Sequence, residues 1–104
     1  MKPIYSSIAS DPDLHELITM FVTEMPDRIS QLNKLLESDD KKGLMYFAHQ
    51  LKGSSGSYGF AELSTAAEEI VKAIKNNSSK NQIITLTQYL IELCKAASAE
   101  SQES

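Results

Sequence analysis

Apolar residues recur at steps of three or four along the first half of the chain, which is the spacing of an amphipathic helix. The first stripe comprises Leu14, Ile18, Phe21, Met25, Ile29, Leu32 and Leu36. Asp11 suits an N-cap and Pro12 the first helical position. The stripe continues through Pro26, which removes one hydrogen bond and clashes with the preceding turn. We therefore expect one long helix kinked at Val22–Pro26 or two abutting helices, and the unbroken stripe favours the kink.

Three more helices are predicted downstream of the loop Ser38-Asp39-Asp40. They run from about Lys41 to Gly56, from Ala61 to Asn76-Asn77, and onward from the capping-box sequence Ser79–Gln82. Their predicted buried residues are Leu44, Phe47 and Leu51; Leu63, Ala67, Ile70 and Ile74; and Ile83, Leu86, Leu90, Leu93 and Ala97. The short connections predict an all-α, antiparallel up-down four-helix bundle with an extra segment at residues 4–9 and no competing strand pattern.

The composition indicates one folded domain over residues 1–104, with a core at about 11–97 and an end, 98–104, expected to fray. Hydrophobic residues make up 41% and charged residues 23%, which excludes a disordered tail. No apolar run approaches a membrane span, and no signal peptide is visible. With a single Cys94 in an apolar stripe, these features predict a cytoplasmic protein. The net charge of −4 argues against a nucleic-acid partner.

One histidine stands on the polar side of the second predicted helix. Measured from His49 at 100° per residue, Phe47, Leu51 and Leu44 lie at roughly 160°, 200° and 220°. The imidazole therefore points away from the core stripe, where another protein can reach it. Its neighbours on the outer face are Met45, Tyr46, Lys52, Gly53 and Gly56.

Glycine at position 53 lacks a local structural reason. Gly43, Gly53 and Gly56 each cost the helix about 1 kcal/mol relative to alanine. Gly56 and Gly59 can be assigned to the helix end, whereas Gly53 cannot. A side chain at position 53 would lean over the turn that holds His49. We interpret Gly53 as the residue that leaves His49 open to an approaching partner.

The run His49, Lys52, Gly53, Ser54, Ser55, Gly56 and Gly59 resembles the motif of the histidine phosphotransfer (HPt) domain family. The resemblance covers nearly the whole chain. It implies a phosphoryl carrier that works between the aspartates of receiver domains in hybrid sensor kinases and response regulators. It also implies that Mg²⁺ belongs to the partner receiver domain and that this chain needs no cofactor. Some members carry a glutamine on the following helix, where this sequence has Val71, which cannot hydrogen-bond.

The residues themselves support the same chemistry. A free imidazole is largely neutral near pH 7 and can attack phosphorus, and a lysine one turn away can pair with the resulting anion. We assign these roles to His49 and Lys52, and partner docking to Met45, Tyr46, Gly53 and Gly56. No Walker motif or Gly-rich loop after a strand is visible, so we expect no ATP site and no enzyme activity of its own. We expect a monomer.

Other functions fit the sequence less well. A non-phosphorylated adaptor that binds signalling partners through the same face is the main alternative, and the intact His49 favours transfer. A domain cut from a larger kinase is a further possibility, although the start at Met1 favours a free-standing protein. His15 and His49 lack metal-ligand spacing, so no metal site is expected, and His15 is interpreted as solvated. A hydrolase would need a nucleophile elbow on a sheet.

Overall fold

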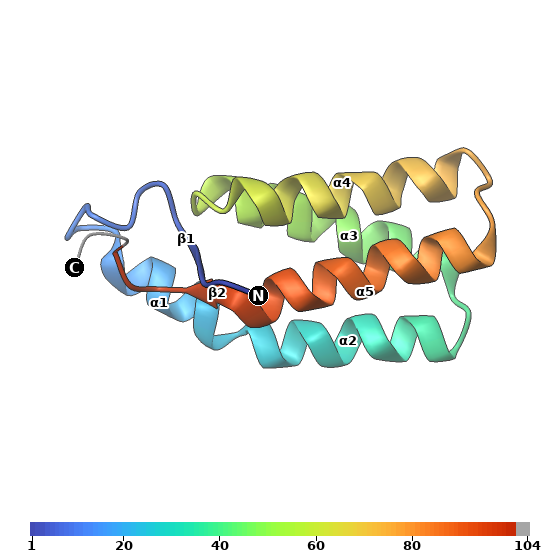
Figure 1. Cartoon of the computed structure of the whole chain (residues 1–104), viewed down its shortest axis with the longest axis horizontal. Helices are drawn as coiled ribbons and strands as arrows, with labels where there is room; N and C mark the ends of the chain where they lie inside the picture. Colours follow the sequence, from blue (N-terminus) through green and yellow to red (C-terminus); the bar gives the residue numbers. More distant parts are fainter. Residues whose placement is uncertain (102–104) are drawn as a thin grey trace.

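The computed structural model describes residues 1–101, which contain five α-helices and two short strands (Figure 1). The helices are α1 (His15–Thr23), α2 (Met25–Glu37), α3 (Lys41–Ser57), α4 (Ala61–Lys75) and α5 (Lys80–Ala96), and the strands are β1 (Ile4–Tyr5) and β2 (Ala97–Ser98). Helices α2 to α5 form the bundle: α3 packs against α2 and α4, and α5 packs against α2 and α4. Helix α1 extends from one end of α2 beside the two strands (Figure 1). The all-α four-helix bundle is confirmed.

The first apolar stripe is carried by two helices, not by one kinked helix. A single residue outside helical structure, Glu24, separates α1 from α2, and Pro26 lies in the first turn of α2. Proline is tolerated there because the first N–H groups of a helix have no partner within it. Helix α1 also begins at His15, later than predicted, because the Asp11 carboxylate caps only a turn, accepting a hydrogen bond of 2.9 Å from the Asp13 N–H.

Local capping defines the helix ends of the bundle. The Asp40 carboxylate accepts a hydrogen bond of 2.8 Å from the Gly43 N–H. The Ser79 hydroxyl accepts one of 3.2 Å from the Gln82 N–H, as the capping-box sequence predicted. A Cβ at Gly43 would collide with the Asp40 carboxylate and with Leu35. Glycine at position 43 therefore leaves room for the Asp40 cap.

Helix α3 ends in a Schellman motif. The Phe60 N–H donates to the Ser55 carbonyl at 2.8 Å, and the Gly59 N–H donates to the Gly56 carbonyl at 3.2 Å. Gly59 has φ +81°, the left-handed conformation that this motif requires. Gly56 is the penultimate residue of α3, so both glycines lie at the helix end as predicted, and only Gly59 has the left-handed conformation.

The core lies between the four helices and is closed by aromatic residues at the α1 end. The largest fully buried hydrophobic side chains are Phe60, Ile18, Leu32, Leu51, Leu63, Ile70, Leu90 and Leu93. The Phe21 ring lies 5.3 Å from the Phe60 ring and 5.2 Å from the Tyr58 ring, measured between centroids. Cys94 is buried in this core, as its position in the α5 stripe predicted.

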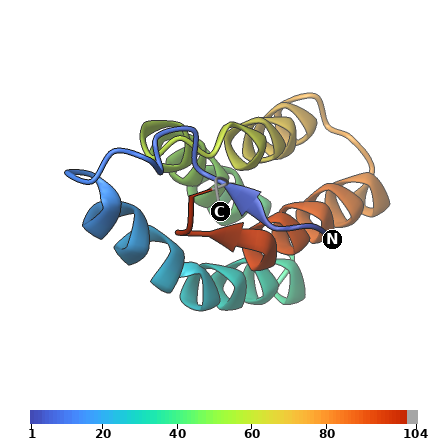
Figure 2. The same ribbon diagram turned by 60° about the vertical axis from the view of Figure 1, so that its left-hand side comes forward.

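Two short segments near the ends of the described chain pair with each other, which the sequence did not predict. Strands β1 and β2 pair in parallel, with Ile4 opposite Ala97 and Tyr5 opposite Ser98 (Figure 2). Ser98, expected in the frayed end, is therefore held by a strand partner. Residues 102–104 of that expected tail lie outside the described residues. The predicted extra segment at residues 4–9 is present and contacts the α3–α4 turn, where the Ser7 N–H donates to the Gly59 carbonyl at 2.9 Å.

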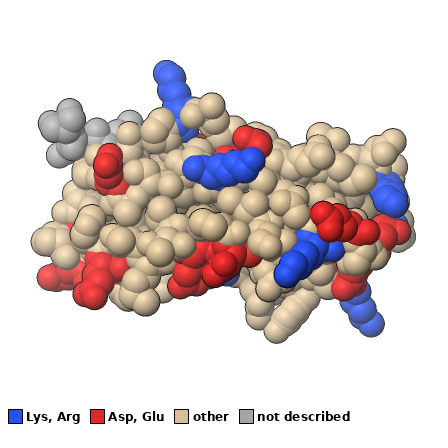
Figure 3. Space-filling model, turned by 90° about the horizontal axis from the view of Figure 1, so that it is seen from below, with Lys and Arg blue, Asp and Glu red and all other residues tan. Residues whose placement is uncertain are grey.

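The surface mixes charges of both signs. In the view of Figure 3, basic and acidic side chains are both present, and the basic side chains do not gather into one patch on this face. Within residues 1–101, no helix combines the length and the apolar character needed to cross a membrane.

Candidate functional site

His49 lies in the middle of α3 with its side chain exposed, as predicted. The same helix buries Leu44, Ala48, Leu51 and Ser55 on its opposite side. Helix periodicity is therefore enough to place the imidazole in solvent.

His49 lines a shallow hollow on this face. It is lined by Met45, Tyr46 and His49 from α3 and by Val71 and Lys75 from α4. Tyr46 is 57% exposed, and its hydroxyl accepts a hydrogen bond of 2.8 Å from the Gln50 side chain. The hollow thus brings together an accessible ring, apolar side chains and a cation.

The space over Gly53 is open. A Cβ built at Gly53 would meet no heavy atom within 4 Å, so this glycine is not required by a close helix contact. A Cβ at Gly56 would reach the Ser64 Oγ at 3.5 Å, an ordinary contact distance. The two glycines therefore differ: Gly53 borders solvent, and Gly56 borders α4.

Lys52 forms an ion pair with Glu68 of α4. Its ammonium lies 3.2 Å from Glu68 Oε1, and the two side chains are 38% and 40% exposed. The hydrogen bond and charge of Lys52, with a smaller contribution from Lys72, lower the pKa of the Glu68 carboxyl. The phosphate-pairing lysine predicted from the motif thus already has an anionic partner, which the sequence analysis missed.

Lys75 is the second residue that the sequence analysis missed. It follows Val71 by four positions, so both residues lie on one face of α4. Val71 marks this face of α4 in the sequence, and Lys75 is the residue one helical turn beyond it. Val71 itself is 7% exposed and forms part of the apolar wall.

The serines after Gly53 have different environments. Ser55 is fully buried, and its hydroxyl has no hydrogen-bond partner among residues 1–101. Ser54 is half-buried and donates to the Leu51 carbonyl at 3.3 Å. Of these two serines, only Ser54 therefore forms a hydrogen bond to the preceding turn.

A protein-family comparison matches the Hpt domain over residues 16–103. The chain belongs to the Hpt domain family. Comparisons with curated proteins and with solved structures gave no match. Hpt domains act in histidine phosphotransfer in two-component signalling, as carriers that interact with receiver domains.

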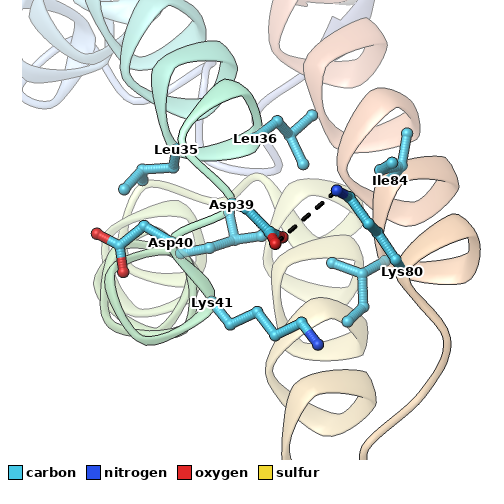
Figure 4. Close-up of a pocket in the computed structure, with 9 residues that line it drawn as sticks. Leu35, Leu36, Asp39, Asp40, Lys41, Lys80 and Ile84 are labelled. Carbon is cyan, nitrogen blue, oxygen red and sulfur yellow. Dashed lines mark ion pairs between the residues drawn. The ribbon is translucent and has the colours of Figure 1, made fainter.

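A second, smaller cavity of this Hpt domain lies away from His49. This cavity of about 20 Å³ near the α2–α3 loop is bordered by Asp39 and Lys80, whose charged atoms lie 3.8 Å apart (Figure 4). It has room for about one water molecule. Within residues 1–101, no three His, Cys, Asp or Glu side chains gather as metal ligands would.

Proposed function

We propose that this Hpt domain carries a phosphoryl group on His49 between aspartates of receiver domains in a two-component phosphorelay. The observation that supports it most directly is the exposed His49 ring in a hollow that also contains Lys75. The open space over Gly53 lets a second protein approach the same face. The donor and acceptor would be receiver domains of a hybrid sensor kinase and of a response regulator.

The transfer step needs little from this chain beyond a nucleophile and cations. The lone pair of one His49 ring nitrogen forms a bond to phosphorus while the bond between phosphorus and the partner's aspartate oxygen breaks. The partner's carboxylate leaves opposite the attacking nitrogen. Mg²⁺ would be supplied by the receiver domain. The reverse sequence delivers the phosphoryl group to the next aspartate, so the domain is a carrier and not an enzyme.

Two lysines can stabilise the phosphoryl group. Lys75 lines the hollow with His49, and Lys52 lies one helical turn along α3. Both are flexible point charges that pair with an anion without strict geometry. We assign phosphate pairing to both lysines.

The docking surface would be a shallow patch around His49. Met45 and Tyr46 provide apolar area, while Gly53 and Gly56 have no side chain that would project towards a partner. A transient encounter of this kind needs only a small interface, on the order of 1,200 Å² in total. We expect a cytoplasmic monomer.

Incubation with a radiolabelled, phosphorylated receiver domain tests the proposal. The domain should gain acid-labile, base-stable phosphate. His49→Gln should abolish labelling, and His15→Gln, which changes an exposed histidine on α1, should label normally. Labelling that persists in His49→Gln would refute the assignment. Receiver binding without any labelling would favour the adaptor.

A further inference from the structure

Three charged residues, Lys52, Glu68 and Lys72, interact at the α3–α4 interface. Lys52 on α3 donates a hydrogen bond of 3.2 Å to Glu68 on α4, and Lys72 lies one turn further along α4. Both cations lower the pKa of Glu68, with Lys52 the larger cause. One carboxylate thus interacts with two ammonium groups.

A phosphoryl group on His49 would compete for the first of these ammonium groups. His49 and Lys52 stand three positions apart on α3, where side chains are neighbours. Phosphoryl oxygens carry more negative charge than a carboxylate and are strong acceptors for lysine. A phosphoryl group that draws the Lys52 ammonium towards His49 would draw it away from Glu68.

We propose that Glu68 is a positioning residue of the phosphoryl site, which holds the Lys52 ammonium while His49 is free and releases it when His49 is phosphorylated. This inference rests on the proposed function. It identifies Glu68 as the residue that sets how strongly Lys52 favours the phosphorylated state.

The exchange requires only a side-chain movement. Lys52 and Glu68 are 38% and 40% exposed, so water solvates both groups during the change. The Lys52 backbone stays anchored, because its carbonyl oxygen accepts a hydrogen bond of 2.9 Å from the Ser64 hydroxyl. Glu68 keeps Lys72 as a cationic neighbour after Lys52 has moved.

Glu68→Gln tests the inference by removing the competing charge. The equilibrium between phosphorylated receiver and phosphorylated His49 should shift towards His49 by about two- to fivefold, the range of an exposed ion pair. Glu69→Gln is the matched control, since it removes an equal charge from the adjacent, exposed position of α4. It should leave the equilibrium near that of the wild type.

Two further measurements separate exchange from a structural role. In a Lys52→Ala background, Glu68→Gln should have less than half of its effect, because there is no longer a lysine to release. In the wild type, treatment with phosphoramidate should raise the pKa of Glu68, measured by carboxyl-carbon NMR, because Lys52 leaves it. The rise should be smaller in Lys52→Ala, where only the charge of the phosphoryl group acts on Glu68.

The outcomes distinguish this inference from the proposed function. Equal effects of Glu68→Gln and Glu69→Gln, or a Glu68 effect that persists in full without Lys52, would overturn the exchange while leaving His49 as the acceptor. A wild-type domain that receivers do not label on His49 would instead overturn the proposed function.

Discussion

The Ser64 hydroxyl on α4 donates a hydrogen bond of 2.9 Å to the Lys52 carbonyl oxygen on α3. This contact joins the two helices one turn beyond His49. It helps to fix how far α4 is shifted along α3. This shift places Glu68 next to Lys52, and it places Lys75 at the hollow that His49 lines.

Ser64→Ala should lower the free energy of unfolding by about 1 kcal/mol, the net worth of one intramolecular hydrogen bond. Urea denaturation measures the loss. Ser57→Ala, at an exposed position of α3, is the control and should remain within about 0.5 kcal/mol of the wild type. Equal stabilities of the two variants would contradict a role for the Ser64 hydrogen bond.

Lys75→Ala and Lys52→Ala should each shorten the lifetime of phosphohistidine several-fold, up to about tenfold, because each removes one partly screened cation near the phosphoryl group. Acid-quenched time courses of dephosphorylation measure the lifetime. Lys42→Ala removes an exposed lysine at the start of α3 and should have little effect. If Lys75→Ala matches Lys42→Ala, Lys75 does not contact the phosphoryl group.

Gly53→Gln should stabilise the fold by up to about 1 kcal/mol while most phosphotransfer is lost. The gain comes from helix propensity in open space, and the loss comes from a side chain over His49 that holds the receiver away. Thermal melts and transfer assays measure the two effects. Gly53→Ala, which adds only a Cβ, should gain stability and retain more transfer. A destabilised Gly53→Gln with normal transfer would show that the glycine serves packing.

Gly59→Ala should destabilise the protein by about 1–3 kcal/mol. The residue has φ +81°, and a Cβ there would lie 2.5 Å from the Ser6 Oγ and 3.0 Å from the Ser7 nitrogen. Asn77→Gly relieves a φ of 55° at the end of α4 and should gain up to about 1 kcal/mol. Denaturant titrations should therefore move in opposite directions for these two variants.

Cys94 should be unreactive in the native protein. Burial raises the pKa of its thiol from 9.0 to about 11, so the thiolate that reacts is scarce at neutral pH. The pKa of the thiol is higher in the folded state than in the unfolded state. The folded protein should therefore have its full stability below pH 9 and lose stability as the pH rises towards 11. Thiol titration with and without denaturant, and melts from pH 8 to 11, measure both effects. Rapid native labelling at pH 7 would contradict them.

Helix positions and the exposure of His49 could be predicted because both depend on residues close in sequence. Asp40 and Ser79 cap helices through N–H groups three residues away, and the periodicity of α3 alone turns His49 away from Leu51. The starting point of α1 was missed because Asp11 and Pro12 serve a turn equally well. Local patterns therefore determine the elements and the accessible histidine.

The surroundings of His49 depend on how α3 and α4 are placed against each other. Glu68 reaches Lys52 across 16 positions of sequence, and Lys75 enters the His49 hollow from the far end of α4. The pairing of Ile4 with Ala97 likewise joins opposite ends of the chain. No single helix pattern specifies the relative height and rotation of two packed helices, which follow from how all the core side chains fit together. Tertiary packing therefore decides which charges surround the histidine that the sequence alone identifies.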